Sequence, residues 1–228
     1  SYYAHSKISL KASKDNYKVI LSGTGADEIF TGYYDHHLFF LSELKNNKDP
    51  LFNENFENWK KYIKPIVRNP FLKDPNKIMC NNNFRDHIYL NKNKVSKILI
   101  NDSNQIFKER KFTKSALKNR MMNELFHESV PVILQEDDLN SMFNSIENRS
   151  PFLDKNLINY VLSVPSKFYI KNGYAKFLLR EATKGMLHET VRVDRKKIGF
   201  NFSLSSLKDF SNNNIKDYLM QKSNLDLF

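Results

Sequence analysis

One segment of the chain carries residue types that can bind phosphate and a metal ion. An apolar run over residues 18–22 leads into Gly23-Thr24-Gly25, and Asp27 follows. Glycines let the backbone approach a ligand closely, and the amides at a helix start attract anions. A carboxylate at this place can hold a Mg²⁺ ion that bridges phosphates. The segment is therefore a candidate nucleotide-phosphate site.

The same letters also fit an ordinary strand-to-helix turn in which Asp27 caps the helix. No Walker A lysine follows and the G-x-G-x-x-G pattern is incomplete, so neither a P-loop nor a dinucleotide-binding fingerprint is present. Two further charged groups are ambiguous on composition alone. Glu147 and Arg149 lie between apolar neighbours and predict a partly buried ion pair that fixes geometry. Residues 194–197 read as a solvated basic turn.

The elements around these residues predict an α/β unit. Residues 4–14 have apolar positions at helical spacing, residues 18–22 read as a buried parallel strand, and residues 26–41 read as a helix. Residues 45–110 contain four prolines and several asparagine clusters, which predict short helices and loops.

The second half of the chain is predicted to be mostly helical. Expected helices cover residues 113–128, 130–147 and 174–186, with another helix capped by Asp154. Residues 194–202 are expected to form a basic loop, and the last 25 or so residues a polar tail. No internal repeat or linker is evident, so residues 1–228 are taken as part of one domain.

Composition narrows the function classes. The chain of 228 residues has 40% hydrophobic residues and one cysteine, which fits a folded protein without a disulfide framework. No apolar run reaches the ~18 residues of a membrane helix, and we expect a cytoplasmic protein without membrane contact. The net charge of +11 comes from lysines scattered among asparagines. This distribution argues against a nucleic-acid binder.

Four motifs, in order, resemble those of the asparagine synthetase family. Residues 22–33 (S-G-T-G-A-D-E-I-F-T-G-Y) resemble the family pattern S-G-E-G-x-D-E-x-F-x-G-Y. Residues 141–154 (S-M-F-N-S-I-E-N-R-S-P-F-L-D) match S-M-x-x-S-x-E-x-R-x-P-F-L-D. Residues 176–182 (K-F-L-L-R-E-A) and 195–200 (R-K-K-I-G-F) resemble K-x-L-L-R-x-A and R-P-K-x-G-F. Residues 45–125 match no family motif.

The resemblance implies an adenine-nucleotide α-hydrolase-like layer, a parallel sheet with helices, that uses ATP and Mg²⁺. Ser22, Gly23 and Gly25 would bind the nucleotide, and Asp27 would hold Mg²⁺ or pyrophosphate. Lys197 would offset the charge that develops on the α-phosphate during adenylation. The implied reaction converts aspartate to asparagine through an acyl-adenylate, with ammonia from a glutaminase domain of the same polypeptide. The resemblance leaves a homodimer open.

One departure from the family pattern concerns proton transfer. Thr24 stands where the family has a glutamate thought to assist the attack of ammonia, and a hydroxyl cannot act as that base near neutral pH. Glu28 is the nearest other carboxylate, but the family shares it, so a structural role is expected. Three explanations remain: a base elsewhere, another acceptor, or lost activity. The alternative acceptor is a uronic acid in surface-polysaccharide biosynthesis.

The roles of several polar residues stay open at this level. Thr24, Glu147 and Arg149 are candidate substrate contacts, although the last two also fit an architectural wall. His36 and His37 are adjacent, so they point to different helix faces and cannot form an i, i+4 metal pair. They are expected to be exposed or hydrogen-bonded, or else to contact the acceptor. A catalytically inactive remnant or helical interaction module is the competing hypothesis from another class.

Two features of the family are absent from these 228 residues. There is no S-G-G-x-D-S pyrophosphate loop and no cysteine-initiated glutaminase region, because Cys80 lies mid-chain. We therefore expect that Ser1 is not the natural start, and that this stretch alone cannot form an acyl-adenylate.

Overall fold

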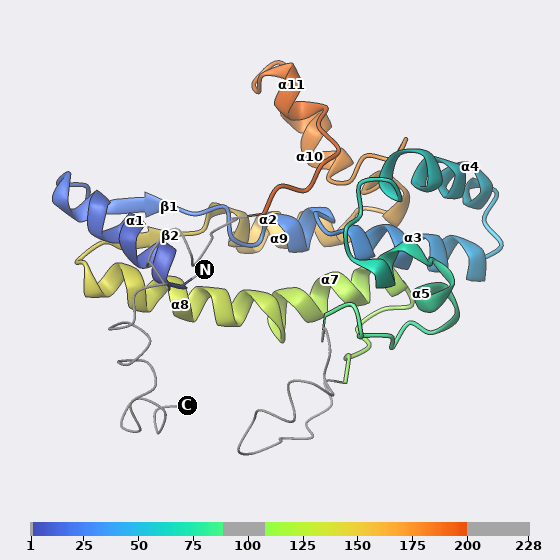
Figure 1. Cartoon of the computed structure of the whole chain (residues 1–228), viewed down its shortest axis with the longest axis horizontal. Helices are drawn as coiled ribbons and strands as arrows, with labels where there is room; N and C mark the ends of the chain where they lie inside the picture. The colour runs from blue at the N-terminus through green and yellow to red at the C-terminus, as the bar shows by residue number, and fades with distance from the viewer. Residues whose placement is uncertain (1, 89–107, 200–228) are drawn as a thin grey trace, which may run out of the picture.

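The computed structural model describes residues 2–88 and 108–199, and these residues form a mostly helical α/β structure. Two strands, β1 (Val19–Leu21) and β2 (Glu147–Arg149), pair in parallel with Val19 opposite Glu147 and Leu21 opposite Arg149. Figure 1 shows this small sheet at one end of an elongated molecule, beside α1 (Tyr2–Lys14) and α8 (Ser129–Phe143).

The prediction of a buried strand over residues 18–22 is wrong in its burial. The regular strand is shorter, although Ser22 N–H continues the ladder by donating to the Arg149 carbonyl over 2.8 Å. Val19 and Leu21 are 40% and 70% exposed. In the described part of the chain β1 pairs only with β2, and the face that carries Val19 and Leu21 is largely exposed.

The helical core lies toward the other end of the molecule. There α3 (Tyr34–Asn46) packs against α7 (Ala116–Phe126), α5 (Asn76–Cys80) and α4 (Leu51–Asn58). The largest fully buried core side chains are Trp59, Tyr169, Phe39, Phe40, Ile29, Leu38, Leu41, Ile63, Ile78, Leu117, Met121 and Ile146. The short helices predicted over residues 45–110 are confirmed in the described part of that range. They include the π-helix η1 (Trp59–Ile63) and the 3-10 helix η2 (Pro70–Lys73).

The single helix predicted over residues 26–41 is two helices. The first, α2 (Ala26–Phe30), ends where Thr31 adopts a left-handed conformation with φ 62°. Thr31 is fully buried, and its hydroxyl donates to the Phe30 carbonyl over 2.5 Å. The break turns the chain, so α3 begins at Tyr34 in a new direction.

The helix predicted over residues 130–147 also ends early. Helix α8 stops at Phe143, and Ser145 takes a left-handed φ of 55°. Ile146 is then buried, and residues 147–149 pair with β1 as a strand. Pairing with a distant strand therefore overrides the helical pattern at this end.

The predicted cap at Asp154 is confirmed. Its Oδ1 accepts hydrogen bonds from the amides of Asn156 and Leu157, each over 2.9 Å, at the start of α9 (Lys155–Ser163). The 3-10 helices η3 (Pro151–Leu153) and η4 (Ser166–Phe168) lie on either side of α9 in the chain.

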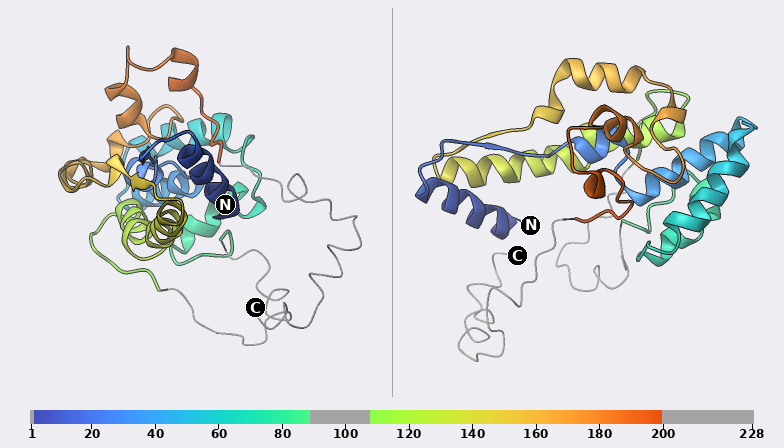
Figure 2. Two further views of the ribbon diagram at one scale, coloured as in Figure 1. Left: turned by 90° about the vertical axis from the view of Figure 1, so that its left-hand side faces the viewer. Right: turned by 90° about the horizontal axis from the view of Figure 1, so that it is seen from above.

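The helix predicted over residues 174–186 is shorter than expected. Helix α10 (Phe177–Ala182) begins only after Lys176, whose φ is 56°. Phe177 and Leu178 are half-buried, whereas Ala182 is exposed. With α11 (Glu189–Arg192), α10 projects from the body of the molecule (Figure 1), and Figure 2 shows the same projection from the side.

Residues 194–199 form the described part of the predicted basic loop. Residues 200–202 of that loop, the predicted C-terminal tail and residues 89–107 lie outside the described residues. Among the described helices, none is both long and apolar enough to cross a membrane.

Candidate functional site

Asp27 contacts two lysines from distant parts of the chain. Its carboxylate forms ion pairs with Lys176, which precedes α10, and with Lys197 of the basic loop. All three side chains are less than 30% exposed, at 17%, 27% and 28%. The structure therefore brings Asp27 and Lys197, which the family resemblance assigns to separate roles, together in one cluster, and Lys176 is a further member.

The chain around Asp27 is tightly constrained. Gly25 precedes α2 with φ 92°, and a Cβ there would overlap the Leu153 side chain. A Cβ at Gly32 would overlap the Asp27 carboxylate itself. The two glycines therefore allow α2 to start close to η3 and the chain to fold back over Asp27.

These three side chains face a pocket of about 560 Å³. The Tyr34 hydroxyl accepts a 3.0 Å hydrogen bond from the amide of Lys197, which ties the basic loop to the start of α3. The Arg195 guanidinium lies over the Tyr174 ring at 3.6 Å and over the Tyr62 ring at 4.1 Å. The pocket is lined by Asp27, Gly32, Tyr33, Tyr34, His37, Ala175, Lys176, Arg180, Thr190, Val191, Asp194, Arg195, Lys196, Lys197 and Ile198.

The pocket has an excess of positive charge. Its lining contains five lysine or arginine side chains against the carboxylates of Asp27 and Asp194. Burial alone would raise the pKa of Asp27, but Lys176 and Lys197 outweigh it and lower the pKa below its usual value. Asp27 is therefore ionised at neutral pH, and the remaining cations favour an anionic ligand.

Two aromatic side chains give the pocket neutral polar walls. Burial, with a smaller effect from His36, lowers the pKa of His37 to about 3, so this imidazole is neutral. Burial and the Glu28 carboxylate raise the pKa of Tyr33, whose hydroxyl donates to Glu28 Oε1 over 2.7 Å. Glu28 is 2% exposed and occupied by this bond, as its expected structural role requires.

The predicted nucleotide contacts Ser22 and Gly23 line a second pocket of about 380 Å³. It lies between α1, β1, α8 and β2, and its other members include His5, Asp137 and Asn148. The structure thus places the candidate nucleotide residues on one side of the Gly23–Gly25 turn and the Asp27–lysine cluster on the other.

Thr24, within that turn, contacts polar groups of the second pocket. Its hydroxyl lies 2.6 Å from Ser22 Oγ and 3.3 Å from Asp137 Oδ2. Asp137 in turn lies 2.8 Å from His5 Nδ1. No sequence pattern indicates His5 or Asp137, because their contact joins α1 to α8 across 132 positions.

The predicted partly buried ion pair of Glu147 and Arg149 is wrong in its burial. The two side chains are joined over 2.8 Å but are 59% and 60% exposed. They alternate with Asn148 along β2, so both point to the same uncovered face of the sheet. In the described part of the chain they line neither pocket and make no contact with Asp27.

The Asp27 cluster fits a magnesium ion that is shared with phosphates. Mg²⁺ is commonly held by one or two carboxylates while substrate phosphates supply further oxygens. Asp27 provides one carboxylate, and its two lysines are suited to the phosphates. A bound cation would screen charge on the phosphates, and the lysines would fix their position.

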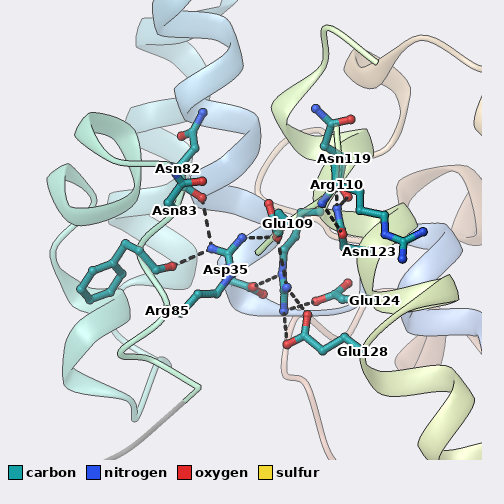
Figure 3. A network of polar contacts seen from close by, with 12 residues as sticks. Asp35, Asn82, Asn83, Arg85, Glu109, Arg110, Asn119, Asn123, Glu124 and Glu128 are labelled. Carbon is teal, nitrogen blue, oxygen red and sulfur yellow. Dashed lines mark hydrogen bonds and ion pairs between the residues drawn. The ribbon is translucent and has the colours of Figure 1, made fainter. Parts of the chain in front are cut away.

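A second group of potential ligands is better explained as a salt-bridge network. Asp35, His36 and Glu124 are buried with ligand atoms close together. Arg120, however, donates to Asp35 over 3.2 Å and to Glu124 over 2.8 Å. Figure 3 shows the carboxylates of Asp35, Glu124 and Glu128 converging in this network. A guanidinium among the carboxylates already supplies the positive charge that a metal would bring.

Sequence reasoning did not name Lys176 or Tyr34 in the first pocket, whereas contact with the acceptor was one of its alternatives for His37. Lys176 opens the K-F-L-L-R-E-A motif, and the family resemblance of this motif assigns no role to its lysine. Tyr34 and His37 follow the glycine turn, and the signal for them is their position one helical turn apart on α3, facing Asp27.

Comparison with known proteins identifies the family of the chain. The asparagine synthase family model matches residues 2–226, and the chain belongs to this family. Asparagine synthetase [glutamine-hydrolyzing] 1 of Bacillus subtilis (strain 168) is 27% identical over 240 residues, which cover 96% of this chain and 36% of the relative. Asparagine synthetase [glutamine-hydrolyzing] 2 of the same organism is 26% identical over 202 residues, 87% of this chain and 24% of the relative.

The chain thus spans about a third of the first relative's length and about a quarter of the second's. No solved structure matches the chain at a significant level.

Proposed function

We propose that the protein takes part in ATP-dependent amidation of a carboxylate through an acyl-adenylate. The observation that carries this proposal is the Asp27 carboxylate held between Lys176 and Lys197 in a pocket with excess positive charge. A partly buried carboxylate beside two ammonium groups suits a metal-bound polyphosphate. Family membership supports the same chemistry.

In this proposal, Ser22 and Gly23 contact the nucleotide, with Gly25 shaping the turn. Asp27 holds Mg²⁺ on the pyrophosphate side. Lys197 and Lys176 offset the negative charge that builds on the phosphates as the carboxylate oxygen attacks the α-phosphorus and pyrophosphate leaves. His37 and Tyr34 line the same pocket, and in this proposal they contact the acceptor.

The activity of the whole natural polypeptide is part of the proposal. We propose that residues 1–228 belong to a synthetase domain with an adenine-nucleotide α-hydrolase-like fold. The two Bacillus relatives are named as glutamine-hydrolysing asparagine synthetases. Their names support aspartate as the acceptor and glutamine, hydrolysed by a glutaminase domain of the same polypeptide, as the source of ammonia. A homodimer is compatible with this proposal.

A uronic acid is the second candidate acceptor. Two features favour it over aspartate. Thr24 departs from the family glutamate, and the acceptor side of the pocket presents Tyr33, Tyr34 and His37, which offer aromatic faces and polar tips to a sugar. The non-enzymatic alternative is that the protein is a catalytically inactive remnant that kept the fold and serves as an interaction module.

The test supplies ATP, Mg²⁺ and ammonium to the whole natural polypeptide with either aspartate or a uronic acid, and measures AMP and pyrophosphate. We expect the wild type to form equal amounts of both products with one of the two acceptors. Asp27→Asn removes the charge at the cluster and is expected to abolish the reaction. Asp15→Asn makes the same change in an exposed i, i+4 ion pair with Lys11 and serves as the control. No ATP turnover with either acceptor would favour the inactive module.

A further inference from the structure

A chain of hydrogen bonds runs from the glycine turn to α1. Thr24 N–H donates to Ser22 Oγ over 3.1 Å, and the Ser22 and Thr24 hydroxyl oxygens lie 2.6 Å apart. The Thr24 hydroxyl donates to Asp137 Oδ2 over 3.3 Å. The other Asp137 oxygen, Oδ1, lies 2.8 Å from His5 Nδ1.

The donor and acceptor of each hydrogen bond in this series can be assigned. An ionised carboxylate only accepts hydrogen bonds, so both His5 Nδ1 and Thr24 Oγ1 donate to Asp137. Once the Thr24 proton points to Asp137, the 2.6 Å contact requires Ser22 to donate to Thr24. One lone pair of the Thr24 oxygen then remains for a further donor, such as a substrate N–H.

Asp137 is held firmly in place. Asp137 is 8% exposed, and the Ser141 hydroxyl donates to the backbone carbonyl of Asp137 over 2.6 Å. Asn140, on the same helix, donates to the Tyr2 carbonyl over 3.1 Å, which fixes α8 against the start of α1 where His5 lies. The carboxylate therefore faces Thr24 from a packed helix pair.

The attack of ammonia needs a proton acceptor that Thr24 alone cannot provide. Two other carboxylates near the turn are already engaged. Glu28 accepts from the Tyr33 hydroxyl, and Asp27 is paired with two lysines. Among the described residues, Asp137 is the carboxylate that contacts Thr24 directly.

We infer that Asp137, acting through the Thr24 hydroxyl and positioned by His5, takes the proton released when ammonia attacks the activated carboxyl group. This inference rests on the proposed function. The nitrogen lone pair forms the C–N bond and the carbonyl electrons move to oxygen. The nitrogen passes one proton to Thr24 Oγ1, while the Thr24 proton moves to Asp137 Oδ2. The oxyanion electrons then re-form the C=O bond as the C–O bond to phosphate breaks, and AMP leaves with the electron pair of that broken bond.

The inferred relay makes Thr24 the group that touches the reacting nitrogen, whereas Asp137 and His5 are positioning residues behind it. It gives a reason for a threonine at this place in the family motif. The Asp137 carboxylate on α8 accepts the proton that the family glutamate would accept at the position of Thr24.

The test separates adenylation from amide formation in the whole natural polypeptide. Exchange of labelled pyrophosphate into ATP measures adenylation, and amide formed from added ammonium measures the second step. We expect Asp137→Asn to retain exchange within a few-fold but to lose amide formation by about 100-fold, the usual effect of removing a general base. Asp15→Asn is the matched control and is expected to change neither rate.

Two further measurements distinguish a proton acceptor from a structural role. Hydroxylamine is a weaker base than ammonia, so its nitrogen loses a proton more readily, and the Asp137→Asn variant should use it with a smaller loss. Adding Thr24→Glu to Asp137→Asn should restore amide formation from ammonium, because the carboxylate then lies at the turn.

The outcomes of these measurements are distinct. An equal fall of exchange and amide formation, or no fall in either, overturns the role of Asp137 and leaves the proposed function standing. Absence of exchange in the wild type with both aspartate and a uronic acid overturns the proposed function and this inference together.

Discussion

The Lys197 ammonium forms an ion pair with the Asp27 carboxylate although 170 positions separate the two residues in the chain. Lys176 holds the other oxygen of the same carboxylate. A phosphate entering the pocket therefore competes with Asp27 for both ammonium groups. A divalent cation at Asp27 removes this competition, because it takes the carboxylate and leaves the lysines to the phosphate.

Gly32 lies against this cluster, and its replacement is expected to displace Asp27. A Cβ at Gly32 would overlap the Asp27 side chain, which the two lysines hold in place. We expect Gly32→Ala to cost about 1–3 kcal/mol of unfolding free energy, as overpacking does. Adenylation, measured by pyrophosphate exchange, should fall about 100-fold, because a carboxylate misplaced by an ångström disrupts the alignment.

Gly199→Ala is the control for the stability measurement, since a Cβ there meets nothing within 4 Å. Urea denaturation of the two variants compares their free energies of unfolding. Wild-type stability and exchange in Gly32→Ala would contradict the close packing of Asp27 against the turn.

Arg120 is expected to be the most sensitive residue of the buried network. Its side chain is 4% exposed and contacts the carboxylates of Asp35, Glu124 and Glu128, the last over 2.5 Å. Arg120→Met leaves these groups without their cation and should lower the free energy of unfolding by about 3–5 kcal/mol.

Arg149→Met removes the same charge from the exposed pair with Glu147, and solvent screens that pair, so stability should change within experimental error. Thermal or urea denaturation measures both variants. Equal effects at Arg120 and Arg149 would contradict the assigned difference in burial.

His36 gives the network a defined pH dependence. Burial alone would lower its pKa, but Glu124 at 2.6 Å and Asp35 outweigh burial and raise the pKa above the ordinary 6.5. A raised pKa in the folded state means that protonated His36 stabilises the fold. This contribution is complete below the ordinary pKa and is lost as pH rises through the raised one.

The difference in unfolding free energy between wild type and His36→Gln, measured by urea denaturation from pH 6.5 upward, should therefore shrink as pH increases. His37→Gln is the neighbouring comparison, because burial lowers the pKa of His37 to about 3, and its effect should stay constant well above the ordinary pKa of 6.5, where this imidazole is neutral in both the folded and the unfolded chain. A difference at His36 that grows with pH would contradict the assigned direction.

Local sequence signals are sufficient for some of these features. The cap at Asp154 depends on amides only two and three residues away, so the N-cap pattern predicts it. The glycine turn before Asp27 is likewise a short-range feature. The roles expected of Asp27 and Lys197 come from the family resemblance, whereas no local pattern predicts an ion pair between residues so far apart.

Other features depend on contacts that the local pattern does not contain. The break at Thr31 is favoured by a fully buried turn that brings α3 into the core. Strand β2 exists because residues 147–149 meet β1, which overrides the helical periodicity before them. The contacts from His5 and Thr24 to Asp137 join three separate elements, so neither type nor spacing indicates them.

The most direct test of the central claim is pyrophosphate exchange into ATP by the whole natural polypeptide carrying Lys197→Met, beside Lys184→Met as the control. Lys184 is exposed and outside both pockets. If Lys197 stabilises the charge that develops on the phosphates, its loss should lower the exchange rate by about 100- to 1,000-fold, while the control keeps the wild-type rate. Exchange at the wild-type rate in Lys197→Met would contradict the assignment of the Asp27–lysine pocket as the adenylation site.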